Sequence, residues 1–326
     1  MRLFADDTCL FIEVDNREET AQKIQSDLVN VNNWSNKWLV TFSPQKTKSL
    51  IISNKNDRLD NPQIVFNQNV ISEVNHHTYL GLKFSFNLKW NAHINDICTK
   101  ASKRLNMMKL FKFKLDRKSL EIMYTTFVRP VMEYGIVVWG GTFDSNILKL
   151  EQINVEALRI ITGATSRSNI SHLYEETSLP SFMDRRDRSM LMMLYKVKIN
   201  IAPNYLINLL PNENRENIHY NLQNNNHIRI PFARHEAYKR SFFPYALKLW
   251  NTLSAEIQML ATVSEFKKHA ICNNEANILY YYGHRWGNIH HARLRIGCSQ
   301  VNYDLFMNLI LLNVNVALHL KQGCIF

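Results

Sequence analysis

The sequence predicts an α+β protein in which short strands come first and helices follow. Apolar runs separated by turn-forming residues fill positions 1–90, as expected of small strands and hairpins. From 91 to 210, apolar residues recur every three or four positions, which is the spacing of amphipathic helices. Only 9 Gly and 8 Pro occur among the 326 residues, so helices with few sharp corners are favoured over an all-β protein.

The first elements are predicted to be a hairpin and a long helix. The segment RLFADDTCLFIEV predicts a strand, a tight turn and a second strand, because apolar runs flank Asp6 and Asp7. A helix should begin near Arg17 and end before Pro44, which cannot continue it. The apolar face of this helix recurs at intervals of three and four, through Ile24, Leu28, Val31, Trp34 and Trp38.

Further strands are expected before residue 90. TKSLIIS predicts a strand, and IVFNQNVI predicts a hairpin around Asn67–Asn69. TYLGLKFSF predicts another strand, with Gly81 as a bulge or a point of close backbone approach.

Four main helical segments are expected next. The first has one apolar face, formed by Trp90, Ile94, Ile97, Ala101, Leu105 and Met108. Asp116 is placed to cap a second helix, which Pro130 should break. The third, SNILKLEQINVEALRIITGA, should end near Gly163, and the fourth, DRRDRSMLMMLYKVKIN, should end at Pro203. These patterns divide the chain into an α+β region (1–90), a helical domain (91–210) and a C-terminal connection region, partly loop (211–326).

The chain is basic, with a formal charge of +11. Much of the excess falls between Cys98 and Leu120, where eight cations meet the single acid Asp116 for a net charge of +7. The cations are Lys100, Lys103, Arg104, Lys109, Lys112, Lys114, Arg117 and Lys118. A charge run is usually a solvated helix face, but this one lacks the Glu–Lys pairs four residues apart that stabilise such a face. It therefore favours contact with the phosphates of a nucleic acid.

The cysteines argue against a disulfide framework. Five occur, far apart and without a C-x-x-C pair, which suits a reducing compartment. His290, His291, Cys298 and Cys324 lack the regular spacing of zinc ligands, so no zinc is expected. The two early acids interrupt any signal peptide, and no stretch predicts a membrane span. An intracellular protein of the cytoplasm and nucleus is expected.

Asp6 and Asp7 are the strongest candidate site. Two acids held close together repel each other unless a cation lies between them. Mg²⁺ binds through one or two carboxylates together with substrate phosphates, the arrangement used in two-metal phosphoryl transfer. Most Asp-Asp pairs are solvated turn residues, but the flanking apolar strands would place this pair at the tip of a core hairpin.

Several segments together resemble the reverse transcriptases of non-LTR (LINE-type) retrotransposons, most closely the jockey/CR1-like group of animals. They are, in chain order, FADDT, WLVTFSPQKTKSLIIS, HTYLGLKFSFNLKWNAHI, YTTFVRPVMEYGIVVWG, LEQINVEALRIITG, FFPYALKLWNTLS and HHARLRIGCSQVNYDLF. One acidic motif would be weak, but these segments in this order are specific. The resemblance implies a remnant of a reverse-transcriptase palm at 1–90, followed by a mostly helical thumb and a C-terminal region.

The resemblance also implies roles for individual residues. Asp6 and Asp7 would be catalytic Mg²⁺ ligands, and Lys46, with Lys48 as second choice, would lie near the phosphates of the incoming nucleotide. The primer-grip-like YLGL implies that Tyr79, Leu80 and Gly81 support the primer end. The basic helices would hold the template–primer duplex by its backbone.

The intact parent would be an RNA-directed DNA polymerase that uses Mg²⁺, dNTPs, an RNA template and a DNA primer. The family takes a third Asp from an earlier palm motif, and only MRLFA precedes the acids here. An N-terminally truncated fragment with little or no polymerase activity is therefore expected. Two alternatives stay open: a non-catalytic nucleic-acid-binding module, and a transposon relic without function. The sequence leaves the oligomeric state open.

Overall fold

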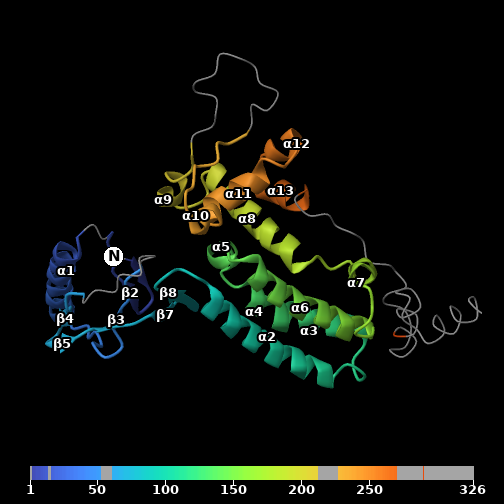
Figure 1. The fold of residues 1–326 in the computed structure, drawn as a ribbon, viewed down its shortest axis with the longest axis horizontal. Helices are drawn as coiled ribbons and strands as arrows, with labels where there is room; N and C mark the ends of the chain where they lie inside the picture. The colour runs from blue at the N-terminus through green and yellow to red at the C-terminus, as the bar shows by residue number, and fades with distance from the viewer. Residues whose placement is uncertain (1, 14–15, 53–60, 212–226, 270–288, 290–326) are drawn as a thin grey trace, which may run out of the picture. The chain divides into compact units, whose positions relative to one another are not determined.

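The computed structural model describes residues 2–13, 16–52, 61–211, 227–269 and 289 (Figure 1). They fall into two compact units, Met1–His93 and Ile94–Phe326, each of which is described on its own. The first unit combines a long helix with small two-stranded sheets, and the second consists mainly of helices. The prediction of an α+β protein is confirmed, whereas the domain borders at residues 90 and 210 stay predictions.

The strands of the N-terminal unit are short and paired two by two. The pairs are β1 (Arg2–Phe4) with β2 (Asp7–Cys9), β3 (Lys48–Ser49) with β6 (Ser72–Glu73), β4 (Val65–Phe66) with β5 (Asn69–Val70), and β7 (His76–Tyr79) with β8 (Leu82–Ser85). The β3–β6 pair is parallel and the other three are antiparallel. Sheets this small depend on neighbouring elements for their stability.

Two of the hairpins turn through two residues that both have positive φ. In β4–β5 these are Asn67 (48°) and Gln68 (60°), which confirms the hairpin expected around Asn67–Asn69. In β7–β8 they are Leu80 (48°) and Gly81 (77°). Such turns match the twist of the paired strands. The expectation of one continuous strand with a bulge at Gly81 is wrong, because the chain reverses there.

Helix α1 (Arg17–Trp38) confirms the long helix predicted from Arg17. The side chain of Asn16 accepts a hydrogen bond from the main-chain N–H of Glu18 (3.0 Å), which satisfies one of the free donors at the helix start. The helix ends at Leu39, which takes the left-handed conformation with φ 54°.

The core of the N-terminal unit lies between α1 and the β4–β5 hairpin. Leu28 of α1 packs with Phe66 and Ile71. Trp34 and Trp38 are 49% and 63% exposed, so the expected apolar face of the helix is not fully covered. The ring centroid of Trp34 lies 6.5 Å from that of Phe42, which packs against this core, so the last turns of α1 are covered only in part.

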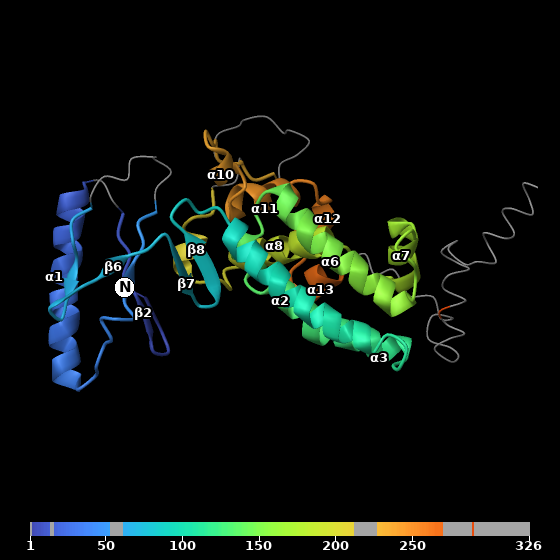
Figure 2. The same ribbon diagram turned by 60° about the horizontal axis from the view of Figure 1, so that its bottom comes forward.

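The second unit is built from helices. They are α2 (Asn91–Leu110), α3 (Arg117–Met123), the π-helix η1 (Tyr124–Val128), α4 (Arg129–Glu133), α5 (Ile136–Trp139), α6 (Asp144–Thr162), α7 (Ile170–Thr177), α8 (Phe182–Lys198), α9 (Asn204–Ile207), α10 (Glu236–Lys239), α11 (Phe242–Trp250), α12 (Ala255–Gln258) and α13 (Val263–His269). Figure 2 shows α2 and α6 as long helices, and α8, seen along its length in Figure 1, is the third long member. None of the helices described is both long and apolar enough to cross a membrane.

Pro130 does not end the helical run that contains it, contrary to expectation. The chain passes from α3 through the π-helix η1 into α4, and Pro130 lies in the first turn of α4. A proline is tolerated there because first-turn N–H groups need no partner within their own helix. The wider π turn just before it interrupts the regular helical hydrogen-bond pattern.

Helix α8 lies against a second group of helices, α11 and α13. Tyr195 of α8 stacks on Phe266 with 4.2 Å between ring centroids, and Trp250 stacks on Phe266 at 5.7 Å. All three side chains are almost completely buried. The hydroxyl of Tyr195 donates to the carbonyl oxygen of Leu260 (2.7 Å), so the buried polar atom is satisfied.

A buried ion pair joins α3 to α7. Arg117 is 1% exposed, and its Nη1 lies 2.9 Å from Oε1 of Glu176, which is also buried. The preceding Asp116 accepts a hydrogen bond from the main-chain N–H of Ser119 (2.6 Å), as its predicted role as a helix cap requires.

Replacing Arg117 with alanine is expected to lower the free energy of unfolding of the helical unit by about 3–5 kcal/mol, because Glu176 would stay buried without its partner. Lys118→Ala removes an exposed cation from the next position and serves as the control. Urea unfolding followed by far-UV circular dichroism compares the two variants. Equal stability of both would show that the ion pair does not hold α3 and α7 together.

Candidate nucleic-acid interface

The two acids lie where the β1–β2 hairpin reverses. Phe4 pairs with Asp7 across a turn formed by Ala5 and Asp6, and Ala5 has φ 51°. A positive φ at the first turn residue is typical of tight hairpins, although it is unfavourable for a residue other than glycine. Both carboxylates are exposed, so the predicted strand–turn–strand presents them to solvent.

The carboxylates suit Mg²⁺ in kind but do not by themselves complete a site. Carboxylate oxygens are the ligands that Mg²⁺ prefers. Among the described residues, no group of three or more His, Cys, Asp or Glu side chains is placed to hold a metal. His290, His291, Cys298 and Cys324 lie outside the described residues.

The predicted nucleotide-binding lysine lies in a tight turn. The main-chain N–H groups of Lys46 and Thr47 donate to the carbonyl oxygen of Ser43 at 3.2 and 3.1 Å, and the side chain of Lys46 is exposed. Lys48, the second choice, donates from Nζ to Oγ of Ser72 (2.8 Å), which fixes it to β6. Lys46 is therefore the freer of the two.

The predicted primer-grip residues form the tip of the β7–β8 hairpin. Tyr79 pairs with Leu82 across the turn, and Leu80 and Gly81 are the two turn residues. Gly81 is exposed, and the other two are half-buried. A tip of this kind can approach a ligand closely, because glycine at positive φ adds no side chain.

Of the eight cations between residues 98 and 120, four contact other protein groups and four are solvated. Arg117 belongs to the buried ion pair, so it does not face a ligand. Arg104 is half-buried: its Nη1 donates to the carbonyl oxygen of Phe127 (2.6 Å), and its guanidinium lies 4.7 Å from the centroid of the Phe127 ring. Lys109 pairs with Glu156 at 3.2 Å, and Lys112 is half-buried beside the Phe113 ring.

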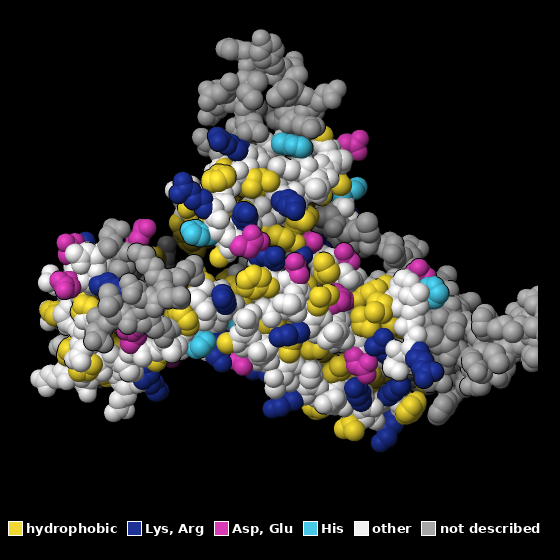
Figure 3. All heavy atoms as spheres, in the orientation of Figure 1, with side chains coloured by type: hydrophobic (Ala, Val, Ile, Leu, Met, Phe, Trp, Pro, Cys, Tyr) yellow, Lys and Arg dark blue, Asp and Glu magenta, His cyan; other side chains and the backbone are white. Residues whose placement is uncertain are grey.

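The remaining four cations form what we call the lysine surface, which consists of Lys100, Lys103, Lys114 and Lys118. All four side chains are exposed, and none forms a hydrogen bond or ion pair with another described residue. Lys100 and Lys103 lie one turn apart on α2, away from its buried face. Figure 3 shows Lys and Arg side chains recurring over α2 and α3.

Apolar side chains are interspersed among these cations. Three of them lie at the end of α2 and just beyond it: Leu110 (73% exposed), Phe111 (38%) and Phe113 (54%). Exposed aromatic rings among cations are typical of surfaces on which unpaired bases stack. The buried face of α2 (Ile94, Ile97, Ala101, Leu105 and Met108) agrees with the apolar pattern predicted for it.

Comparison with known proteins gives one consistent result. The chain is 24% identical over 186 residues to a probable RNA-directed DNA polymerase from transposon X-element of Drosophila melanogaster, covering 56% of this chain and 20% of the relative. The homologues of this chain are polymerases of non-LTR retrotransposons. Those of transposon BS and mobile element jockey, from the same species, are 24% and 22% identical over 57% and 62% of this chain.

The predicted relation to LINE-type reverse transcriptases is therefore confirmed, at low identity. The matched part of this chain spans only 21% and 22% of the BS and jockey polymerases, about a fifth of their length. No family model and no solved structure matches the chain. The roles of Asp6, Asp7, Lys46 and the hairpin tip stay predictions.

Arg104→Ala and Lys103→Ala compare a cation of α2 that makes structural contacts with a neighbouring cation that is solvated. Loss of the Arg104 hydrogen bond and ring contact is expected to lower the free energy of unfolding by about 1–3 kcal/mol. Lys103→Ala should leave it unchanged, because the Lys103 side chain is solvated. Thermal unfolding of the two variants measures this. If Lys103→Ala also lowers the free energy of unfolding, Lys103 makes a structural contact and does not belong to the solvated lysine surface.

Proposed function

We propose that the chain is part of an RNA-directed DNA polymerase and that its helical unit holds an RNA–DNA template–primer duplex by the backbone. The lysine surface is the observation behind this proposal, since its four ammonium groups are exposed and have no acidic partner among the described residues. Lysines placed in this way neutralise phosphates without reading bases. The polymerase relatives supply the class of nucleic acid.

In the same proposal the N-terminal unit contributes groups to nucleotidyl transfer. Asp6 and Asp7 would hold Mg²⁺, which supplies charge stabilisation at the transferring phosphate. Lys46, exposed in its turn, would contact the phosphates of a dNTP, and the Tyr79–Gly81 tip would support the primer end. Each of these groups is presented by a short turn or hairpin, so the main chain positions it.

We further propose that these 326 residues do not extend a primer by themselves. The resemblance assigns the third metal-binding carboxylate to a motif that has no match in this sequence. Transfer without it would lose most of the positioning of the reacting groups. We also propose that the protein acts in the cytoplasm and nucleus, where its template and primer would be found. A binding module without catalysis is the second candidate, which the lysine surface alone would satisfy.

The double variant Lys100→Ala/Lys103→Ala is expected to weaken binding to a labelled RNA–DNA duplex. Each lost phosphate contact should reduce the slope of log affinity against log salt by about 0.9. Lys248→Ala/Lys267→Ala removes two exposed lysines from α11 and α13 and is the matched control. Fluorescence anisotropy across a salt series measures both slopes. If both double variants lose affinity equally, net charge rather than the lysine surface governs binding.

Asp6→Ala tests the catalytic part of the proposal. Duplex affinity should be unchanged, because the proposed contact with the duplex backbone is made by the lysine surface and not by Asp6 or Asp7. Primer extension on a primed RNA template with Mg²⁺ and dNTPs should be absent in both the parent chain and the variant. Extension by the parent chain that Asp6→Ala abolishes would overturn the proposed inactivity and show that the carboxylate hairpin is competent.

A further inference from the structure

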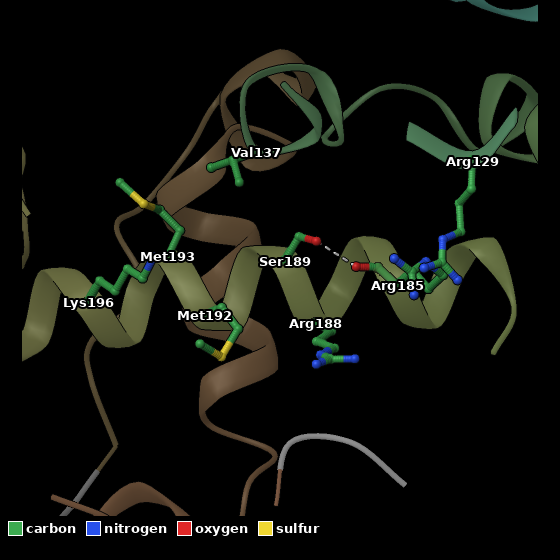
Figure 4. Close-up of a pocket in the computed structure, with 8 residues that line it drawn as sticks. All are labelled: Arg129, Val137, Arg185, Arg188, Ser189, Met192, Met193 and Lys196. Carbon is green, nitrogen blue, oxygen red and sulfur yellow. Dashed lines mark hydrogen bonds between the residues drawn. The ribbon is translucent and has the colours of Figure 1, made fainter. Parts of the chain in front are cut away.

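A cation-lined pocket of about 470 Å³ lies in the helical unit, where α8 faces α4 and α5. Arg185, Arg188 and Lys196 line it from α8, Arg129 from α4 and Val137 from α5. Figure 4 shows Arg129 reaching from α4 toward Arg185. The lining residues include four cations and no carboxylate.

The pocket follows one stripe of α8. Its α8 residues recur at intervals of three and four, at 185, 188, 189, 192, 193 and 196, so they share one face of the helix. From the first to the last, this stripe is about 16 Å long at the usual helical rise. The opposite face, with Met190, Leu194 and Tyr195, is buried in the core shared with α11 and α13.

The acids in the DRRDRS segment do not neutralise the stripe. Asp184 is used at the start of α8, where it forms a capping box with Ser181. Asp187 pairs with Arg186 at 2.8 Å and accepts a hydrogen bond from the hydroxyl of Tyr245 (2.7 Å). The charge excess of this helix face is therefore not evident from the sequence, where two acids lie among the three arginines of positions 184–188.

One carboxylate, that of Glu133, pairs with the guanidinium groups of both Arg185 and Arg129. Glu133 receives hydrogen bonds from both Nε and Nη2 of Arg185, the latter at 2.6 Å, and lies 3.7 Å from Nε of Arg129. Arg188 and Lys196 form no side-chain hydrogen bond or ion pair with any other residue that the structure describes. The pocket thus keeps an excess of positive charge.

Mutual repulsion of the cations adds to the cost of their burial. Burial lowers the pKa of Arg188, and the charges of Arg185 and Arg129 lower it further. Burial also lowers the pKa of Arg129, with Arg185 as the next cause. For Arg185 the burial effect has the same sign, but the hydrogen bonds and charge of Glu133 outweigh it and raise the pKa. An added anion would relieve this repulsion.

We propose that the pocket formed by Arg129, Arg188 and Lys196 is a binding site for phosphate oxyanions. The planar forks of arginine side chains suit phosphate oxygens, and Arg188 can form two parallel hydrogen bonds without giving up another partner. Lys196 adds a second positive charge two to three helical turns along the stripe. The phosphate can belong to a nucleic-acid backbone or to a free phosphate compound.

This site is distinct from the lysine surface and does not rest on the proposed polymerase function. Its residues belong to α4 and α8, whereas the lysine surface belongs to α2, α3 and their connection. If Arg188 variants lose phosphate binding while Lys100→Ala/Lys103→Ala does not affect duplex binding, the pocket stands and the proposed duplex contact falls.

The test uses Arg188→Gln in the full chain, with Arg167→Gln as the control. Arg167 is an exposed arginine after α6 that makes no hydrogen bond or ion pair with the described residues, so both variants remove one charge and no structural contact. Titration calorimetry measures binding of inorganic pyrophosphate. Fluorescence anisotropy measures binding of an oligonucleotide and of its uncharged methylphosphonate counterpart. Circular dichroism shows that both variants are folded.

Arg188→Gln is expected to weaken binding of a phosphate ligand by about tenfold or more, as for loss of a charged hydrogen bond. Arg167→Gln should bind like the parent chain. If Arg188→Gln weakens binding of pyrophosphate, the ligand is a free phosphate compound. If it weakens binding of the oligonucleotide alone, and not of the methylphosphonate counterpart, the ligand is the phosphate of a nucleic-acid backbone. Arg188→Lys should recover part of the affinity. Equal binding of the parent chain and Arg188→Gln to both charged ligands, or no binding at all, would overturn the proposal.

Discussion

The arrangement of the helical unit depends on Glu151 of α6, which joins three helices through one carboxylate. Its Oε2 accepts the main-chain N–H of Phe182 (2.8 Å) at the start of α8, where helical N–H groups otherwise lack partners. Its Oε1 accepts hydrogen bonds from Asn154 (2.9 Å) and from the hydroxyl of Tyr174 in α7. Burial and the hydrogen bond to Glu151 raise the pKa of Tyr174 further above neutrality, so this hydroxyl stays a hydrogen-bond donor to Glu151 even in alkaline solution. Helix α8, placed in this way, carries the pocket residues Arg185 and Arg188 on one face and packs on the Trp250–Phe266 core with the other.

The same physical distinction separates structural from solvated cations within the basic segment 98–120. There the arginines that leave water gain a carboxylate or carbonyl partner, as Arg117 does with Glu176 and Arg104 does with the main chain of Phe127. A cation that stays solvated keeps its charge available to a ligand, as Lys100 and Lys103 do. The proposed duplex contact therefore involves only part of the basic segment, and the strongest structural contacts are made by its arginines.

Sequence reasoning succeeded where structure is local. Helix α1, the Asn67 hairpin and the cap at Asp116 follow from periodicity, turn residues and capping chemistry within a few positions. It could not tell Arg104 or Arg117 from the neighbouring lysines, because their partners lie 23 and 59 positions away along the chain. The same limit concealed the pocket on α8, since Asp184 and Asp187 offset most of the arginine charge in the sequence but have other partners in the fold.

Lysine footprinting would test most directly whether the four solvated lysines of the lysine surface contact the duplex. The full chain is acetylated with and without an RNA–DNA duplex, and the modification of each lysine is measured by mass spectrometry. The account predicts that the duplex protects the four members of the lysine surface and leaves Lys248 and Lys267 as reactive as before. Protection of Lys248 and Lys267 with unchanged reactivity at Lys100 and Lys103 would contradict it, because the duplex would then lie on another face of the helical unit.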